Sequence, residues 1–156
     1  MNYKLTEEEV EQILSRYPNK RAAILPLLRR IQKKVGHIPP EAERYAAGLL
    51  SLHTSQVHEV VTFYSWFREK PAGKHLIVVC ESICCSLLGS EEVLKHLKDR
   101  LKIDVGETTS DKRFTLETVE CLAQCDNAPA IMVDDEVYAS VTPDVIDRIL
   151  KEKKNV

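Results

Sequence analysis

Hydrophobic residues near the start of the chain recur with the period of an α-helix. Val10, Ile13 and Leu14 fall on one helical face, the arrangement expected of an amphipathic helix. Just before this face, Thr6 and Glu9 stand three residues apart, which is the spacing of a capping box. The sequence therefore predicts a helix that begins directly after Thr6.

Three more amphipathic segments follow in the first half of the chain. Gly36 is predicted to end the first of them, and Pro40 suits the first turn of the second. Thr54 or Ser55 is predicted to cap the third. Helices of this kind are stable when their apolar faces pack together, so we expect residues 1–70 to form an N-terminal helical bundle.

The hydrophobic pattern changes after residues 71–74, a stretch typical of a turn or domain boundary. The elements predicted after it are a buried strand at 75–79, a helix from Ser90, a weaker strand at 114–120, a hairpin at 130–138 and a last helix that begins at Thr142–Pro143. This order is typical of a small α/β layer, so residues 74–156 are predicted to form a second domain.

The overall charge excludes some classes of partner. Lys and Arg together number 22 against 24 Asp and Glu, which gives a formal net charge of −2. Nucleic-acid binding requires a clear basic excess, so no nucleic acid is expected as the main partner. The first residues lack the apolar run of a signal peptide, and no stretch approaches the ~20 apolar residues of a membrane span. We therefore expect a cytoplasmic protein without direct membrane insertion.

All five cysteines lie in the second half of the chain, in two groups. Cys80 directly follows the predicted buried strand, with Cys84 and Cys85 close behind it, and Cys121 and Cys125 directly follow the second strand. Side chains at strand ends can converge on one point because the sheet holds the connecting loops in place. In a reducing compartment, cysteines in this arrangement indicate metal ligands or redox groups rather than disulfides.

Four thiolates suit either an iron–sulfur cluster or a zinc ion. Structural zinc sites most often place two to four residues between paired ligands in both halves. Here four, 35 and three residues separate Cys80, Cys85, Cys121 and Cys125, which favours iron–sulfur but leaves zinc open. Cys84 could also replace Cys85 as a ligand. Otherwise Cys84 is expected to be a small buried residue.

Other redox chemistries fit the sequence poorly. The five histidines show no metal-ligand spacing with the cysteines, which argues against a Rieske-type centre. A disulfide-exchange enzyme would need the C-x-x-C motif, which the sequence lacks. The chain also has no glycine-rich phosphate loop, so neither NADH nor flavin is expected to bind to this chain itself.

Several motifs occur together in an order that resembles one known family. They are Cys80-x4-Cys85 after an apolar strand, Cys121-x3-Cys125-x2-Ala128-Pro129, Tyr138, Thr142-Pro143-Asp144, Gly36-His37-Ile38-Pro39-Pro40 and Val57-x2-Val60-Val61-Thr62-Phe63-Tyr64. The pattern is similar to that of the thioredoxin-like [2Fe–2S] ferredoxins. Within them it most resembles the E subunits of bacterial NADH-quinone oxidoreductase, the 24 kDa subunit family of mitochondrial complex I.

This resemblance implies a fold and a ligand set. The fold would be of the α/β class, with an N-terminal helical bundle followed by a thioredoxin-like [2Fe–2S] ferredoxin domain. Cys80, Cys85, Cys121 and Cys125 would hold one [2Fe–2S] cluster. The ligand spacing of the family thus selects Cys85 over Cys84, and iron–sulfur over zinc.

The resemblance also implies a function. The chain would be an electron-transfer subunit of NADH:quinone oxidoreductase, in the peripheral arm of a membrane-associated complex, with no independent catalytic site. It would exchange single electrons with FMN on a partner flavoprotein subunit that also binds NADH. An equivalent subunit of an NAD-linked hydrogenase or formate dehydrogenase is the close alternative. A zinc-stabilised interaction module is the remote one, and the helical extension disfavours a free-standing ferredoxin.

Two local features carry further expectations. Ala123 stands where the family often has glycine, and alanine enters positive φ at greater cost, so this loop is expected to differ in backbone or N–H placement. The aromatic run at 63–67 would supply anchors for an interface with the flavoprotein if it were exposed. Ordinary core packing is the favoured interpretation of that run.

Overall fold

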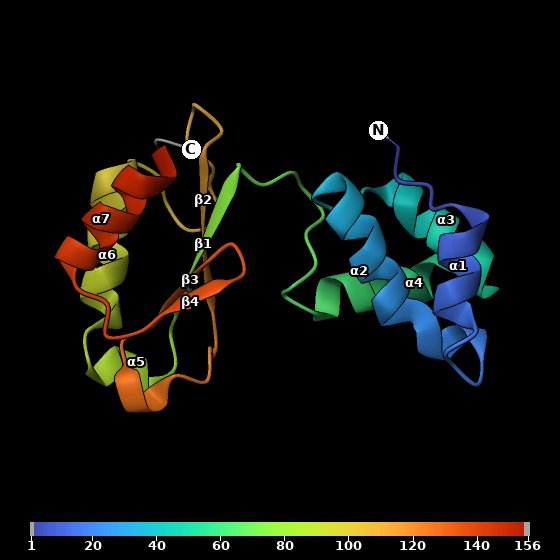
Figure 1. The fold of residues 1–156 in the computed structure, drawn as a ribbon, viewed down its shortest axis with the longest axis horizontal. Coiled ribbons are helices and arrows are strands. Elements are labelled where there is room, and N and C mark those ends of the chain that lie inside the picture. Colours follow the sequence, from blue (N-terminus) through green and yellow to red (C-terminus); the bar gives the residue numbers. More distant parts are fainter. Residues whose placement is uncertain (1, 155–156) are drawn as a thin grey trace. The chain divides into compact units, whose positions relative to one another are not determined.

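The computed structural model describes residues 2–154 of the chain. They form two compact units, Met1–Pro71 and Ala72–Val156, which are drawn in Figure 1. The buried hydrophobic residues of each unit form a core of that unit's own. Within residues 2–154, no helix combines the length and the hydropathy needed to span a membrane.

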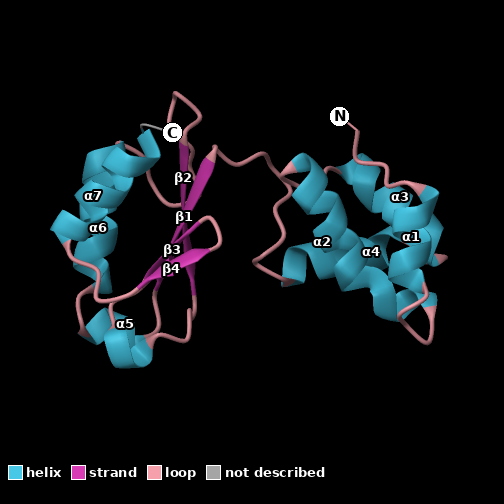
Figure 2. Cartoon of the chain, viewed as in Figure 1, coloured by secondary structure: helices cyan, strands magenta, loops and turns pink. Residues whose placement is uncertain are grey.

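The first unit is a bundle of helices (Figure 2). Its elements are α1 (Glu7–Leu14), the 3₁₀ helix η1 (Lys20–Ala23), α2 (Ile24–Val35), α3 (Pro40–Leu50) and α4 (Thr54–Phe63). Each α-helix presents an apolar face to the shared core, where residues such as Leu28, Leu50 and Val57 are almost fully buried. The predicted helical bundle is confirmed.

Local signals account for most helix ends. Thr6 and Glu9 form the predicted capping box, in which each side chain accepts the backbone N–H of the other residue. Gly36 ends α2 in a left-handed conformation with φ of 88°, a geometry that favours glycine. Pro40 is the first residue of α3, as expected for a residue whose missing N–H costs nothing there.

The start of α4 differs from the prediction. Its N-cap is His53 rather than Thr54 or Ser55, because the imidazole Nδ1 accepts the backbone N–H of Ser55. The side chain of Gln56 accepts the N–H of His53 in return, which completes a capping box. A ring nitrogen thus supplies the acceptor that a hydroxyl or carboxylate oxygen usually provides.

The aromatic run after α4 lies mostly on the surface. The exposed fractions of Phe63, Tyr64 and Trp66 are 79%, 42% and 48%, whereas Phe67 is buried. Core packing is therefore the wrong interpretation for three of the four rings. The reason is that α4 ends at Phe63, so the helical period that would carry Tyr64 onto the face of Val61 stops one residue too early.

The second unit is an α/β layer around a four-stranded sheet. Its elements are β1 (His75–Cys80), α5 (Ile83–Leu87), α6 (Ser90–Leu101), β2 (Phe114–Val119), the 3₁₀ helix η2 (Cys125–Asn127), β3 (Ile131–Val133), β4 (Glu136–Tyr138) and α7 (Pro143–Lys154). The strand order is β2-β1-β3-β4. β1 runs parallel to β2 and antiparallel to β3, and β3 and β4 form the predicted hairpin.

Helices α6 and α7 pack on the sheet (Figure 1). Ile77 and Val79 of β1 are two residues apart, so both point to the face that α6 covers with Leu97. The three side chains are each no more than 1% exposed, and burial of a side chain such as Leu97 contributes about 1.5–3 kcal/mol. This packing fixes β1, the strand that leads into the first cysteine group.

The hairpin turn is tied to two other elements by Asp134. Its Oδ1 accepts the backbone N–H of Leu76 at 3.1 Å, and its Oδ2 lies 3.0 Å from His75 Nδ1 and 3.2 Å from Lys153 Nζ. Burial of the carboxyl opposes its ionisation, but these three partners outweigh burial and hold the pKa of Asp134 below its usual range. Asp134 therefore links β1, the hairpin and α7.

Candidate metal centre

The two predicted cysteine groups leave the sheet at the same end. β1 and β2 are parallel neighbours, and Cys80, the last residue of β1, pairs with Val119, the last residue of β2. Cys121 follows Val119 by two residues. Because parallel strands end at one edge of the sheet, Cys80 and Cys121 are placed side by side by the register of the strands.

A short helix brings Cys85 back to Cys80. α5 was not predicted, because its Ile83 and Leu87 point outward and give no pattern directed at the core. Both sulfur-bearing residues are buried, with exposed fractions of 2% for Cys80 and 1% for Cys85. Burial raises the pKa of the Cys85 thiol, and the hydrogen bond and charge of Cys80 raise this pKa further.

Cys121 and Cys125 form the exposed half of the group. The backbone N–H of Ala123 donates a hydrogen bond to Cys121 Sγ at 3.2 Å. Cys125 opens η2, whose ribbon lies beside α5 in Figure 1. The hydrogen bond to Cys84 raises the pKa of the Cys125 thiol, and the neighbouring charge of Cys121 acts in the same direction.

Cys84 belongs to the same group of sulfurs. It is half-buried rather than fully buried, so the expectation of a small buried residue is wrong. Cys84 contacts Cys125, whereas Cys85 contacts Cys80. The structure thus brings all five cysteines together, and the choice of Cys85 over Cys84 as a ligand stays a prediction.

The spread of the sulfurs fits a dinuclear centre better than a single zinc ion. A tetrahedral zinc site with Zn–S bonds of about 2.3 Å places all its sulfurs about 3.8 Å apart. Within residues 2–154, no three cysteine sulfurs lie within 4.8 Å of one another. Thiolates are the ligands that iron–sulfur clusters select, and the bond from Ala123 to Cys121 is of the kind that stabilises added negative charge on sulfur. The donor set therefore fits a [2Fe–2S] cluster.

An exposed apolar surface adjoins the cysteines and was missed in the sequence. Ile83, Leu87 and Leu88 are 73%, 80% and 59% exposed, and they flank Cys84 and Cys85 in the chain. Their signal was present in the sequence, since residues four apart on a helix share one face. We call Ile83, Leu87 and Leu88 the α5 apolar surface.

Comparison with known proteins identifies relatives along nearly the whole chain. Residues 10–154 match the model of the thioredoxin-like [2Fe–2S] ferredoxin family. The second E-type subunit of the NADH-quinone oxidoreductase of Rhizobium meliloti (strain 1021) is 40% identical over 144 residues, which are 92% of this chain and 86% of that protein. NADP-reducing hydrogenase subunit HndA of Solidesulfovibrio fructosivorans is 36% identical over 144 residues, 92% of this chain and 84% of that protein.

A solved structure shares the fold. It is an NAD⁺-reducing [NiFe]-hydrogenase in the H₂-reduced state, with a TM-score of 0.71 and 19% sequence identity, and the match covers 82% of this chain and 22% of that chain. The expected family resemblance is confirmed, and membership implies a [2Fe–2S] cluster. The named relatives are subunits of oxidoreductase complexes, which implies partner subunits. This chain belongs to the thioredoxin-like [2Fe–2S] ferredoxin family.

Proposed function

We propose that this chain is the electron-transfer subunit of a bacterial-type NADH:quinone oxidoreductase, respiratory complex I. Cys80, Cys85, Cys121 and Cys125 are its cluster ligands in this proposal. The observation that carries it is the meeting of two cysteine pairs at the shared end of β1 and β2. A bound [2Fe–2S] cluster supplies one-electron chemistry that no amino-acid side chain here provides.

The protein residues around the cysteines have separate tasks. Cys80 and Cys85 are buried against Ala130, so water is excluded from that side of the site. Cys121 and Cys125 are exposed, which leaves the other side open to a partner. The N–H of Ala123 points at Cys121 Sγ and offsets part of the negative charge that the sulfurs share.

The proposed partner is a flavoprotein subunit that binds NADH and FMN. The α5 apolar surface lies next to Cys84 and Cys85 in the chain, so a protein that covers it comes close to the cysteines. Large exposed apolar side chains of this kind are typical of interfaces. In this arrangement the chain itself needs no catalytic site, because hydride chemistry takes place on the partner.

The close alternative is the equivalent subunit of an NAD-linked hydrogenase or formate dehydrogenase. Its support is the 36% identity to the hydrogenase subunit HndA, which is near the 40% identity to the quinone-reductase relative from Rhizobium meliloti. Purification of the native complex and identification of the subunits that accompany this chain distinguishes the machines. Quinone-reductase subunits support the proposal, and a hydrogenase large subunit supports the alternative.

A test of the cofactor itself uses the chain purified without oxygen. We expect a brown protein that contains iron and acid-labile sulfide and gives one unpaired spin per chain after reduction, measured by electron paramagnetic resonance. A colourless protein that contains zinc in place of iron would establish the zinc-stabilised module instead. A fully loaded iron protein with no signal after reduction would also overturn the proposal.

A further inference from the structure

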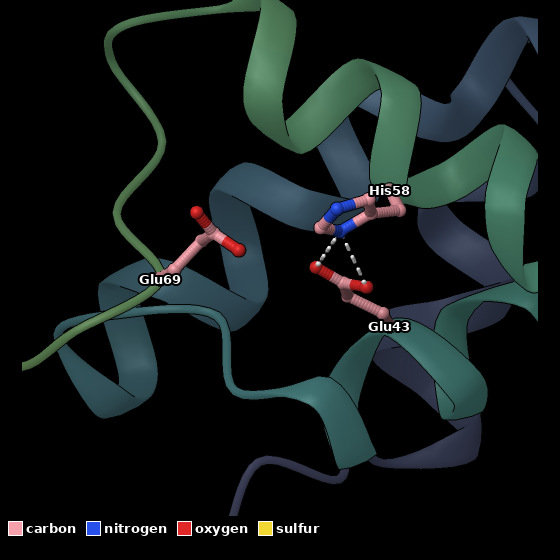
Figure 3. Close-up of side chains that lie close together, drawn as sticks. All are labelled: Glu43, His58 and Glu69. Atoms are coloured by element: carbon pink, nitrogen blue, oxygen red, sulfur yellow. Dashed lines mark hydrogen bonds and ion pairs between the residues drawn. The ribbon is translucent and has the colours of Figure 1, made fainter.

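A second group of metal-ligating side chains lies in the helical unit, which holds none of the cysteines. Glu43 comes from α3, His58 from α4 and Glu69 from the segment that follows α4 (Figure 3). One ligand atom of each residue can be chosen so that all three lie within 4.8 Å of one another. Figure 3 shows the imidazole of His58 directly over the carboxylate of Glu43.

The carboxylate of Glu43 is buried, with an exposed fraction of only 5% for the residue. His58 Nδ1 lies 3.2 Å from each of its two oxygens. A buried carboxylate needs compensation for the water it loses, and one imidazole supplies at most a single positive charge. Glu69 adds a second carboxylate to the same place, so the trio carries excess negative charge whichever form His58 takes.

One imidazole and two carboxylates form a recognised type of donor set. Imidazole nitrogen and carboxylate oxygen bind zinc at about 2.0–2.2 Å, and three protein ligands with one remaining position for water are a common arrangement. A divalent cation would balance the two carboxylates completely with a neutral His58. From this geometry and charge we propose that Glu43, His58 and Glu69 bind one divalent transition-metal ion, with Zn²⁺ as the representative ion.

The ion would have a structural effect on the exposed aromatic segment. His58 and Glu69 lie on either side of Phe63, Tyr64 and Trp66 in the sequence, so a shared metal closes a loop around these rings. Closing such a loop reduces the conformational freedom of the segment it contains. The aromatic surface would then be held in one arrangement by α3 and α4, with no part in electron transfer.

The simpler interpretation is an ion pair between His58 and Glu43 alone. That interpretation gives Glu69 no role, and Glu69 is exposed, so its replacement does not threaten the fold. Glu69→Gln keeps the size of the side chain and removes its charge. Glu59→Gln is the matched control, because Glu59 is an exposed glutamate directly beside His58 on the same helix.

The test uses the full chain with its cysteines occupied as purified, and Zn²⁺ as the probe. We expect zinc titration by calorimetry to show a site that Glu69→Gln weakens roughly 10- to 100-fold and that Glu59→Gln leaves unchanged. Zinc should raise the melting temperature of the wild type more than that of Glu69→Gln. Anomalous diffraction at the zinc edge should place the ion between the three side chains.

Two outcomes would overturn the metal site. One is zinc affinity in Glu69→Gln equal to that of the wild type. The other is anomalous density at the cysteines or elsewhere, with none between Glu43, His58 and Glu69. Neither outcome bears on the iron–sulfur proposal, because the two groups of ligands share no residue.

Discussion

Ala123 donates its backbone N–H to Cys121 Sγ while its own backbone is left-handed, with φ of 55°. Alanine adopts this conformation at a cost of about 1–2 kcal/mol, which glycine avoids. The N–H therefore reaches the sulfur with a strained residue in the position where the family often has glycine. The strain is accepted because the hydrogen bond requires this local geometry.

The first prediction concerns that strain. Ala123→Gly should raise the free energy of unfolding by up to about 1 kcal/mol, since relief of strain exceeds the added entropy of the unfolded chain. Ala139→Gly is the control, because Ala139 is exposed and lacks positive φ, so the change should destabilise by about 0.4–1 kcal/mol. Urea denaturation measures both. Equal destabilisation by the two changes would contradict the argument.

The second prediction separates the adjacent cysteines. Cys84→Ser should leave the iron and sulfide contents near those of the wild type, whereas Cys85→Ser should lose or remodel the cluster. The physical reason is that Cys85 is buried against Cys80, so its sulfur has no alternative position. Metal and sulfide analysis of both variants, with visible absorption, gives the answer. The reverse result would assign Cys84 as the ligand.

The third prediction is a pH dependence from Asp134. Hydrogen bonds from His75, Leu76 and Lys153 outweigh burial and lower the pKa of Asp134 in the folded chain. The unfolded chain then binds more protons near its ordinary pKa of 3.8, so the stability from Asp134 is full above that value and is lost as pH falls through the lower folded pKa. Asp134→Asn should make the acid loss of stability less steep.

Urea unfolding at a series of pH values between neutrality and pH about 3 measures this slope. Asp135→Asn, which removes the neighbouring carboxylate of the same turn, is the matched control. An unchanged slope in Asp134→Asn, or an equal change in both variants, would show that the Asp134 contacts do not contribute.

The fourth prediction concerns the start of the second unit. The N–H of Gly73 donates to Thr115 Oγ1, and a Cβ at Gly73 would lie 3.0 Å from backbone atoms of Arg113 and Phe114. Gly73→Ala should therefore destabilise the chain by about 1–3 kcal/mol, because backbone cannot yield as a flexible side chain can. Gly48→Ala in α3 meets nothing within 4 Å and should stabilise by about 0.5–1 kcal/mol. Thermal denaturation compares them, and equal effects would refute the contact.

The fifth prediction tests the α5 apolar surface. Leu87→Ser should weaken association with the flavoprotein subunit by at least about fivefold, the equivalent of 1 kcal/mol, and leave the iron content unchanged. Val137→Ser on β4 removes another exposed apolar side chain and should leave association unaffected. Co-purification and binding titration of the two variants make the comparison. Wild-type association by Leu87→Ser would remove this surface from the interface.

Elements with local signals were predictable from the sequence. Thr6 with Glu9, Gly36 and Pro40 each act on the backbone within a few residues, so helix ends at these positions agree with the structure. The short helix α5 was missed because five residues with outward apolar side chains resemble a loop. The exposure of Tyr64 was missed because it depends on where α4 ends, which no nearby residue marks strongly.

The candidate sites differ in the same way. The grouping of Cys80 with Cys121 could be predicted because both follow strands directly, and parallel pairing then brings them together. Glu43, His58 and Glu69 come from three separate segments with no recurring spacing, so only their positions in the folded bundle unite them. A charged residue that is buried, such as Glu43, has no mark in the sequence.

The alignment of Cys80 with Val119 makes metal insertion a check on strand pairing. A slip of one residue would shift Cys80 along its neighbour by about 3.3 Å and turn its side chain to the opposite face of the sheet. Only chains whose two parallel strands have aligned correctly can then present four sulfurs to one centre. Loading of the metal thus proofreads the β1–β2 ladder, and misaligned chains remain metal-free and distinguishable by colour.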